Sequence, residues 1–288
     1  MARLHLHLVS DSTGETLESV AKACLSQFEG AEAIKHFWPM IRSERQLDRA
    51  MEEVAQRPGL VLFTLVNPQM RDRLQSRCLT LGLPAISVLD PVLQALSQFL
   101  GQSARGLPGR QHAMDAAYFR RIEAVHFTMA HDDGQQPEDL NDADIVVLGV
   151  SRTSKTPTSI YLANRGYKTA NVPIVPTTPL PDTLFTLTRP LVVGLTTSPD
   201  RLVHIRRNRL RSMNQSEDTD YVRDEEVSAE LTFARRLYAQ HNWPVIDVTR
   251  RSIEETAAAI VNLVTQREGA ARAATKNTNP GGGGDDVE

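Results

Sequence analysis

Short apolar runs rich in β-branched residues recur along the chain and predict the strands of a sheet. Each run is bounded by turn residues or by residues that favour the start of a helix. The expected strands are Leu4–Val9, Leu60–Val66, Ala85–Leu89, Ile145–Leu148, Asn171–Val175, Leu191–Leu195 and Val245–Val248.

Helical periodicity occupies the intervals between these strands. One apolar helix face is formed by Leu17, Val20, Ala21, Cys24, Leu25 and Phe28, which follow the i, i+3, i+4, i+7 spacing. Residues 43–46 and 252–255 have the sequence of a capping box and predict the starts of two further helices. Because strands alternate with helices, we predict an α/β fold with a mainly parallel sheet and flanking helices.

Glycine, proline and polar residues divide the chain into regions. They cluster between residues 101 and 109 and again between 131 and 141, on either side of a helical pattern at 113–130. We therefore expect an N-terminal α/β region at 1–100, a helical connector at 101–140 and a C-terminal α/β domain at 141–268. The Gly-rich polar remainder, 269–288, is predicted to be a disordered tail.

Composition excludes several classes of protein. The 288 residues carry a formal net charge of -3, with 41% hydrophobic and 23% charged residues. This balance does not favour nucleic-acid binding, for which a strongly basic domain is usual. The start of the chain lacks a signal-peptide pattern, and no window approaches the roughly 20 apolar residues of a membrane span. We expect a cytoplasmic protein, with no membrane association and with two cysteines in a reducing compartment.

The segment after the predicted strand Ile145–Leu148 carries the strongest chemical signal. It has the Walker A spacing G-x-x-x-x-G-K-[ST], with Ser154 in place of the second glycine. Backbone N–H groups of such a loop converge on a phosphate at a helix N-terminus. The predicted nucleotide-binding residues are Gly149, Val150, Ser151, Arg152, Thr153, Ser154, Lys155 and Thr156.

Two side chains of this loop have individual roles in the prediction. Lys155 supplies a positive charge to the phosphates and is a predicted catalytic residue, and the hydroxyl of Thr156 is placed to ligate Mg²⁺. The region 141–268 is then a P-loop kinase-like domain. The alternative is a plain strand-to-helix turn with a solvated lysine, and Ser154 adds a Cβ that alters the shape of the loop.

Three further features of the sequence each allow more than one role. Residues 6–16 repeat the order of strand, hydroxyl-rich turn and helix without a lysine. This turn either binds a second anion at the helix N-terminus, places Asp11 near a substrate hydroxyl, or is ordinary helix capping by Ser12 or Thr13. Asp247 ends an apolar strand, either as a magnesium ligand or as a simple strand end. The arginines at 201–211 form either a lid over phosphates, a docking patch for an anionic partner or a solvated helix face.

Four segments resemble the regulatory proteins of pyruvate, phosphate dikinase. They are VSDSTGET at 9–16, HFWP at 36–39, GVSRTSKTPTS at 149–159 and GYKTANVP at 166–173. The resemblance extends over most of residues 4–268, and the family commonly has glycine where this chain has Ser154. It implies a bifunctional enzyme that phosphorylates a threonine of the dikinase with ADP as donor, leaving AMP. The same enzyme removes that phosphate by phosphorolysis, with inorganic phosphate as acceptor and diphosphate as product.

The resemblance leaves the target and some details open. A related branch acts on phosphoenolpyruvate synthase with the same chemistry. We expect Asp11 to orient or deprotonate the acceptor hydroxyl, and one phosphate cradle to serve both ADP and free phosphate. The alternatives are an ATP-dependent small-molecule P-loop kinase and a nucleotide-dependent binding switch. A homo-oligomer is compatible with the sequence.

Overall fold

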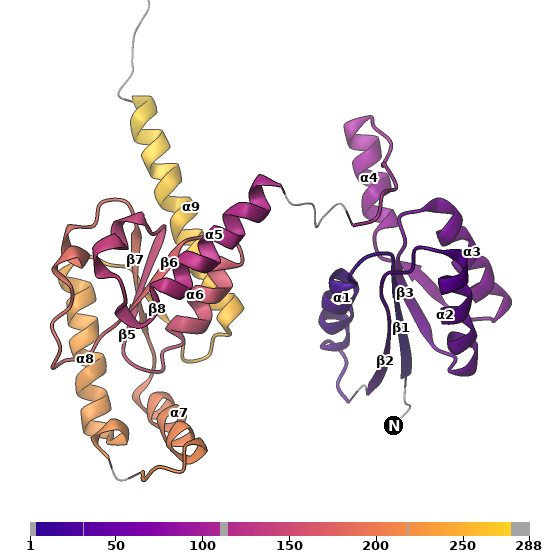
Figure 1. Cartoon of the computed structure of the whole chain (residues 1–288). Helices are drawn as coiled ribbons and strands as arrows, with labels where there is room; N and C mark the ends of the chain where they lie inside the picture. The colour runs from indigo at the N-terminus through magenta and orange to yellow at the C-terminus, as the bar shows by residue number, and fades with distance from the viewer. Residues whose placement is uncertain (1–3, 31, 110–114, 218, 278–288) are drawn as a thin grey trace, which may run out of the picture. The chain divides into compact units, whose positions relative to one another are not determined.

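The computed structural model describes residues 4–30, 32–109, 115–217 and 219–277, with side chains up to residue 270. The chain divides into two compact units, Met1–Ala113 and Met114–Glu288. Each unit contains a four-stranded parallel sheet covered by helices on both faces (Figure 1). The α/β fold with parallel sheets and flanking helices is therefore confirmed.

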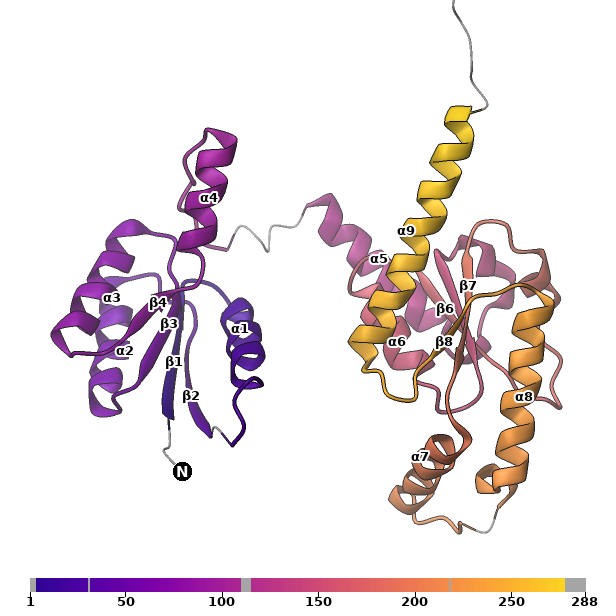
Figure 2. The same ribbon diagram turned by 180° about the vertical axis from the view of Figure 1, so that it is seen from behind.

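The sheet of unit 1 has the strand order β2-β1-β3-β4. Helix α1 covers one face, and α2 and α3 cover the other (Figures 1 and 2). The elements are β1 Leu4–Ser10, α1 Glu15–Leu25, β2 Ala33–Trp38, α2 Glu44–Gln56, β3 Leu60–Thr64, α3 Pro68–Thr80, β4 Ala85–Ser87 and α4 Asp90–Leu100.

The core of unit 1 follows from the alternation of side chains along its central strand. Leu6 and Leu8 pack with α1, whereas Val9 packs with α2 and α3 on the opposite face. The predicted capping box is confirmed at the start of α2, where the Ser43 side chain accepts from the backbone of Gln46 and the Gln46 side chain accepts in return.

Unit 2 has the strand order β6-β5-β7-β8, so the two sheets share one topology. Its helices and strands are α5 Ala116–Ala130, β5 Ile145–Gly149, α6 Lys155–Ala163, β6 Thr169–Pro173, β7 Leu191–Thr196, α7 Pro199–Ser212, α8 Asp224–Gln240, β8 Val245–Asp247 and α9 Ile253–Asn277. Four short 3₁₀ segments are also described: η2 Asp132–Gly134, η3 Pro137–Asp142, η4 Asp182–Thr186 and η5 Asp220–Val222.

The central strand β5 is buried along its whole length. Ile145 and Val147 pack against α6 and α9, and Val146 and Leu148 belong to the core on the side of α8. Burial on both faces explains why this strand is a continuous apolar run rather than an alternating one. The strand ends at Gly149 inside the packed core, and the phosphate loop begins directly after it.

Several boundaries differ from the sequence-based expectation. Strand β2 was absent from the predicted set, because it lies at the edge of its sheet and its residues are only half-buried or exposed.

The segment expected as a connector is divided between the two units. Helix α5 belongs to unit 2, where the Thr169 amide donates to the Thr128 hydroxyl of this helix. Helix α9 continues to Asn277, because the alanine-rich residues 270–274 favour a helix over the disorder expected from residue 269. Residues 278–288 lie outside the described part.

No helix within the described ranges is both long and apolar enough to cross a lipid bilayer.

Candidate phosphate-binding site

The loop between β5 and α6 has the geometry of a phosphate cradle. Gly149 ends β5 without a positive φ, and a Cβ at this position would collide with the Thr153 hydroxyl. That hydroxyl donates to the Val150 carbonyl over 2.9 Å and closes the loop on itself. Gly149 is therefore required by close packing inside the loop and not by a left-handed turn.

Two residues of the loop adopt left-handed backbone conformations although neither is glycine. Arg152 has φ 72° and Ser154 has φ 62°. Such a conformation costs a non-glycine residue on the order of 1 kcal/mol. Ser154 thus takes the conformation that glycine would supply at the second glycine position of the motif. The loop keeps its shape, at a cost in stability.

The N-terminus of α6 opens into a cavity of about 360 Å³. No side chain of Ser154 caps the helix, so the first-turn N–H groups are left for another acceptor. The predicted loop residues Ser151, Arg152, Ser154, Lys155 and Thr156 line this cavity together with Asp133, Pro157, Pro173 and Ile205. A helix N-terminus with a lysine in such a cavity binds anions.

Lys155 is held inside the loop and only 6% exposed. Its ammonium group donates to the Val150 carbonyl over 3.2 Å. Burial lowers the pKa of Lys155 to about 8, and the charges of Asp133 and Asp132 oppose this shift. A phosphate bound in the cavity would supply a further counter-charge to the buried ammonium group.

The hydroxyl of Thr156 takes part in a network with two residues that the sequence analysis did not select. It donates to a carboxylate oxygen of Asp132 over 2.9 Å and accepts from the side-chain amide of Asn171 over 2.9 Å. The Asn171 amide also donates to Asp132. The network joins η2, α6 and β6, which fixes the carboxylate next to the hydroxyl expected to ligate Mg²⁺.

This donor set fits a magnesium ion. Mg²⁺ prefers oxygen ligands and is usually bound by one or two protein groups together with phosphate oxygens and water. Thr156 and Asp132 supply a hydroxyl and a carboxylate, and the buried Oδ1 of Asn171 has no hydrogen-bond partner in the described part of the chain. Three-residue clusters of His, Cys, Asp or Glu suited to a metal are absent from the described residues, so a metal here would depend on the phosphates for its other ligands.

Arg206 of α7 ties the loop to its surroundings. It is 1% exposed and forms an ion pair with Glu230 of α8 over 2.6 Å. Its guanidinium also donates to the Ser151 carbonyl over 3.3 Å and lies over the ring of Tyr221. Tyr221 in turn shares a hydrogen bond with the Ser151 hydroxyl. Arg206 therefore supports the phosphate loop through Ser151, and it does not itself line the cavity.

The remaining arginines of the 201–211 cluster are exposed. The cluster thus consists of one buried positioning residue and four surface residues, and Arg211 pairs with Glu217.

Asp247 lies at the end of β8, the edge strand of the sheet, and its carboxylate accepts from the backbone and hydroxyl of Thr249. It is separated from the loop strand β5 by β7. Asp247 therefore stabilises the turn before α9 and does not face the phosphate cavity.

Asp11 belongs to unit 1 and follows β1. It is 5% exposed, and its carboxylate accepts from the backbone of Val66 over 2.7 Å. Burial raises the pKa of Asp11, while the hydrogen bond from Val66 opposes that shift. The carboxylate lines a cavity of about 110 Å³ with Ser10, Ser12 and Thr64. It is a desolvated acid beside hydroxyl groups.

The sequence analysis missed Asp132, Asp133, Asn171 and the separate role of Arg206. In the sequence, Asp132 and Asp133 are only part of a polar turn that comes before the strand leading to the phosphate loop. In the structure Asp133 has a left-handed φ of 50°, and the turn lies against the loop through the hydrogen bond from Thr156 to Asp132. The position of the turn in the sequence gave no sign of this contact.

Comparison with known proteins agrees with these observations. The model of the kinase/pyrophosphorylase family matches residues 6–261. A protein of Rhizorhabdus wittichii is 68% identical over 267 residues, which are 93% of this chain and 97% of that relative. Proteins of Novosphingobium aromaticivorans (63% over 270 residues, 94% and 96%) and Bradyrhizobium diazoefficiens (53% over 265 residues, 92% and 95%) are also similar.

All three relatives bear the name "Putative pyruvate, phosphate dikinase regulatory protein". The family match covers both units and includes the whole phosphate loop. The chain belongs to the kinase/pyrophosphorylase family, a family of phosphotransferases.

Proposed function

We propose that this chain regulates pyruvate, phosphate dikinase by adding and removing a phosphate on a threonine of that enzyme. In one direction the β-phosphoryl group of ADP is transferred to the threonine hydroxyl and AMP leaves. In the other, inorganic phosphate accepts the phosphoryl group and diphosphate leaves. The observation that carries this proposal is the buried Lys155 at an uncapped helix N-terminus, within a chain whose relatives are named for the dikinase.

The loop residues contribute charge and position. Phosphoryl transfer requires mainly in-line placement and neutralisation of charge on the transferred group. The N–H groups of residues 150–156 surround the phosphate, and Lys155 donates to the oxygen that gains charge. Thr156 and Asp132 would hold Mg²⁺, which supplies further neutralisation of phosphate charge when bound. Arg206 keeps the loop in its receptive conformation through the Ser151 carbonyl.

The acceptor hydroxyl must lose its proton as the new O–P bond forms. We assign this role to Asp11, a carboxylate whose pKa is raised by burial and therefore closer to the working pH than that of an exposed aspartate. In the reverse reaction an oxygen of inorganic phosphate bonds to the phosphorus of phosphothreonine. The threonine oxygen leaves with a proton returned from Asp11.

One cradle binds both ADP and inorganic phosphate in this proposal. The described residues contain a single loop of the Walker A type, and its cavity of about 360 Å³ accommodates either the β-phosphate of ADP or free phosphate. ADP and inorganic phosphate then compete for binding. Simultaneous binding of both without mutual displacement would contradict the shared cradle.

The proposal is tested by incubating the full chain with purified dikinase and ADP radiolabelled at its β-phosphate. We expect label on a dikinase threonine, and release of labelled diphosphate when unlabelled phosphate is then added. ADP labelled at its α-phosphate is the control and should leave the protein unlabelled. Turnover of ATP on a small acceptor without any labelled protein would contradict the proposal.

The same assay identifies the target. With phosphoenolpyruvate synthase in place of the dikinase, the account predicts little or no label. Label on the synthase alone would retain the chemistry and replace the partner.

A further inference from the structure

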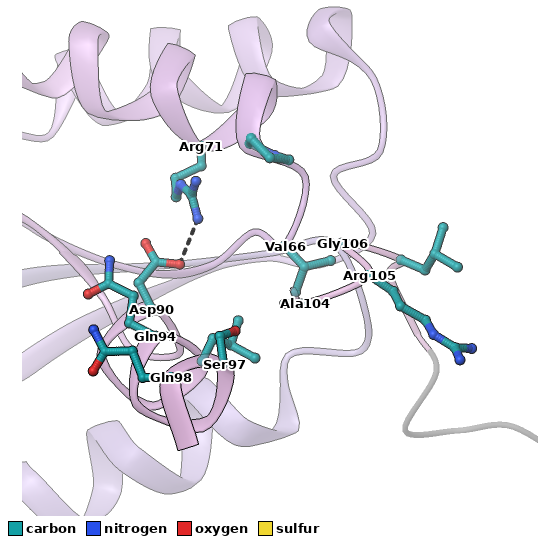
Figure 3. Close-up of a pocket in the computed structure, with 12 residues that line it drawn as sticks. Val66, Arg71, Asp90, Gln94, Ser97, Gln98, Ala104, Arg105 and Gly106 are labelled. Atoms are coloured by element: carbon teal, nitrogen blue, oxygen red, sulfur yellow. Dashed lines mark hydrogen bonds and ion pairs between the residues drawn. The ribbon is translucent and has the colours of Figure 1, made fainter. Parts of the chain in front are cut away.

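Unit 1 contains a cavity of about 610 Å³ that has no part in the phosphate site. The start of α3, the length of α4 and the segment 104–107 form its walls (Figure 3). Its volume lies within the range typical of ligand-binding pockets.

The cavity lies at the edge of the sheet where ligands usually bind. In the order β2-β1-β3-β4 the chain moves outward in opposite directions from β1 and β3, so the switch point lies between these two strands. Ligands of open parallel sheets bind outside the carboxyl ends of the strands at such a point. Val66, just beyond β3, and Leu107 line both this cavity and the smaller one that contains Asp11, so the two are neighbours.

The charged residues that line the cavity are Arg71, Asp90 and Arg105. Arg71 and Asp90 form an ion pair across it over 2.9 Å. This pair joins one nitrogen to one oxygen, whereas a guanidinium has five N–H donors and a carboxylate can accept several bonds. The pair thus has capacity to bind both an acceptor and a donor of a ligand. A nucleotide polyphosphate is expected to bind more tightly at the uncapped helix and lysine of unit 2 than in this cavity.

Two glutamine side chains add a repeated amide. Gln94 and Gln98 lie one helical turn apart on α4, and Figure 3 shows them projecting in the same direction. Four residues of α-helix rise about 6 Å. Two residues of an extended chain span about 6.6 Å, which is the repeat of backbone groups that face one side. Each side-chain amide can therefore pair with the N–H and C=O of alternate residues in an extended peptide.

We propose that this cavity binds an extended segment of the target polypeptide, so that unit 1 recognises the protein substrate and unit 2 binds the nucleotide. The inference rests on the proposed function, which requires a protein acceptor. The apolar side chains of Val66, Leu93 and Leu107 contact the side chains of the bound segment, and the ion pair and the two amides hold its backbone.

The test compares steady-state kinetics of the wild type with the double variant Gln94→Ala and Gln98→Ala, using purified dikinase and ADP. Both glutamines are exposed, so the fold should be kept. Loss of two amide pairs should raise the KM for the dikinase about tenfold, with an unchanged kcat and an unchanged affinity for ADP. The matched control is Gln75→Ala with Gln102→Ala, two exposed glutamines outside the cavity, which should leave every constant at its wild-type value.

Each outcome separates the inference from the function on which it rests. An unchanged KM for the dikinase in an active double variant would overturn the docking site alone. A weaker affinity for ADP would assign the cavity to the nucleotide and would also overturn it. Failure of the wild type to label the dikinase would remove the proposed function, and the docking site with it.

Discussion

The two units share one strand order but differ in the residues that come directly after the first strand of each sheet. In unit 2, β5 leads into a loop whose lysine and uncapped helix attract anions. In unit 1, β1 ends at Ser10 and leads into Asp11 and Ser12, so a buried acid lies between two hydroxyl groups. The common topology places a crevice at the switch point of each sheet. The side chains at the end of the strand then decide which chemistry the crevice supports.

Burial disfavours the charged form of the key residue in both units, with different consequences. It lowers the pKa of Lys155 and raises that of Asp11. A bound phosphate favours the charged form of Lys155, since it supplies an opposite charge inside the cavity. At Asp11 the hydrogen bond from Val66 and the charge of Arg42 oppose the shift, but burial outweighs them, so the carboxylate gains a proton more readily than an exposed aspartate. We therefore expect unit 2 to bind an anion and the carboxylate of unit 1 to accept a proton.

The largest effect is expected from removal of the positive charge in unit 2. Lys155→Ala should reduce transfer from ADP at least ~10³-fold, because the phosphate oxygens lose their charged donor in a water-poor site. The assay is single-turnover labelling of the dikinase, with unfolding followed by circular dichroism. Lys168→Ala is the matched control, since Lys168 pairs with Glu123 at the surface of the same unit. Near-wild-type transfer by Lys155→Ala would refute the role of the loop.

The acid of unit 1 is tested by Asp11→Asn, which keeps an oxygen for the Val66 amide. We expect a loss in kcat of about 10²-fold, typical of removing a general base, with unchanged ADP affinity. Because the folded pKa of Asp11 is raised, its ionised form destabilises the folded state above its unfolded pKa. The variant should therefore be at least as stable as the wild type at neutral pH. Asp72→Asn, on the exposed surface of α3, is the control; equal kcat values in the two variants would exclude Asp11 from the proton transfer.

The magnesium ligand is tested by Asp132→Asn, which retains an acceptor for the Thr156 hydroxyl but removes the charge. The Mg²⁺ concentration at half-maximal rate should rise about tenfold or more, because a charged oxygen ligand is lost. Titration of Mg²⁺ binding to the ADP complex by calorimetry gives a readout independent of turnover. Asp247→Asn should leave both curves unchanged. A shift in the Asp247 variant alone would return the metal to the end of β8.

A pH effect should follow from the lowered pKa of Lys155, about 8 before a phosphate binds. Bound phosphate raises this pKa, so ADP binding above pH 8 should take up close to one proton, and affinity should fall by up to about tenfold per pH unit there. Below pH 8 the lysine is already charged, so the proton uptake that accompanies ADP binding disappears. Calorimetry in buffers of different ionisation enthalpy measures the proton count. The same uptake in Lys155→Ala would assign it to another group.

The smallest effect concerns the strained backbone of the loop. Ser154→Gly should stabilise the chain by up to about 1 kcal/mol, since Ser154 has φ 62° and glycine adopts that conformation without a Cβ penalty. Chemical denaturation measures the change. Ser76→Gly, on the exposed face of α3, should instead destabilise by several tenths of a kcal/mol. Destabilisation by both substitutions would show that Ser154 is not strained.

The sequence predicted the fold class and the order of strand, loop and helix at 145–163 because both depend on local pattern. Strand β5 is a continuous apolar run, and the loop has a fixed spacing after it. The edge strand β2 was missed because its half-exposed residues lack a clear apolar face. Asp132 and the separate role of Arg206 were missed because the contacts that reveal them are distant in sequence. They cross 24 residues from Thr156 to Asp132 and 55 residues from Arg206 to Ser151. Helical and strand periodicity carry no information on such pairs.

The central claim is that the phosphate loop of unit 2 is the site of ADP, and isothermal titration of the full chain with ADP tests it most directly. The account predicts one site per chain, displacement of ADP by inorganic phosphate, and loss of binding in Lys155→Ala. ADP binding of wild-type strength in Lys155→Ala would contradict it.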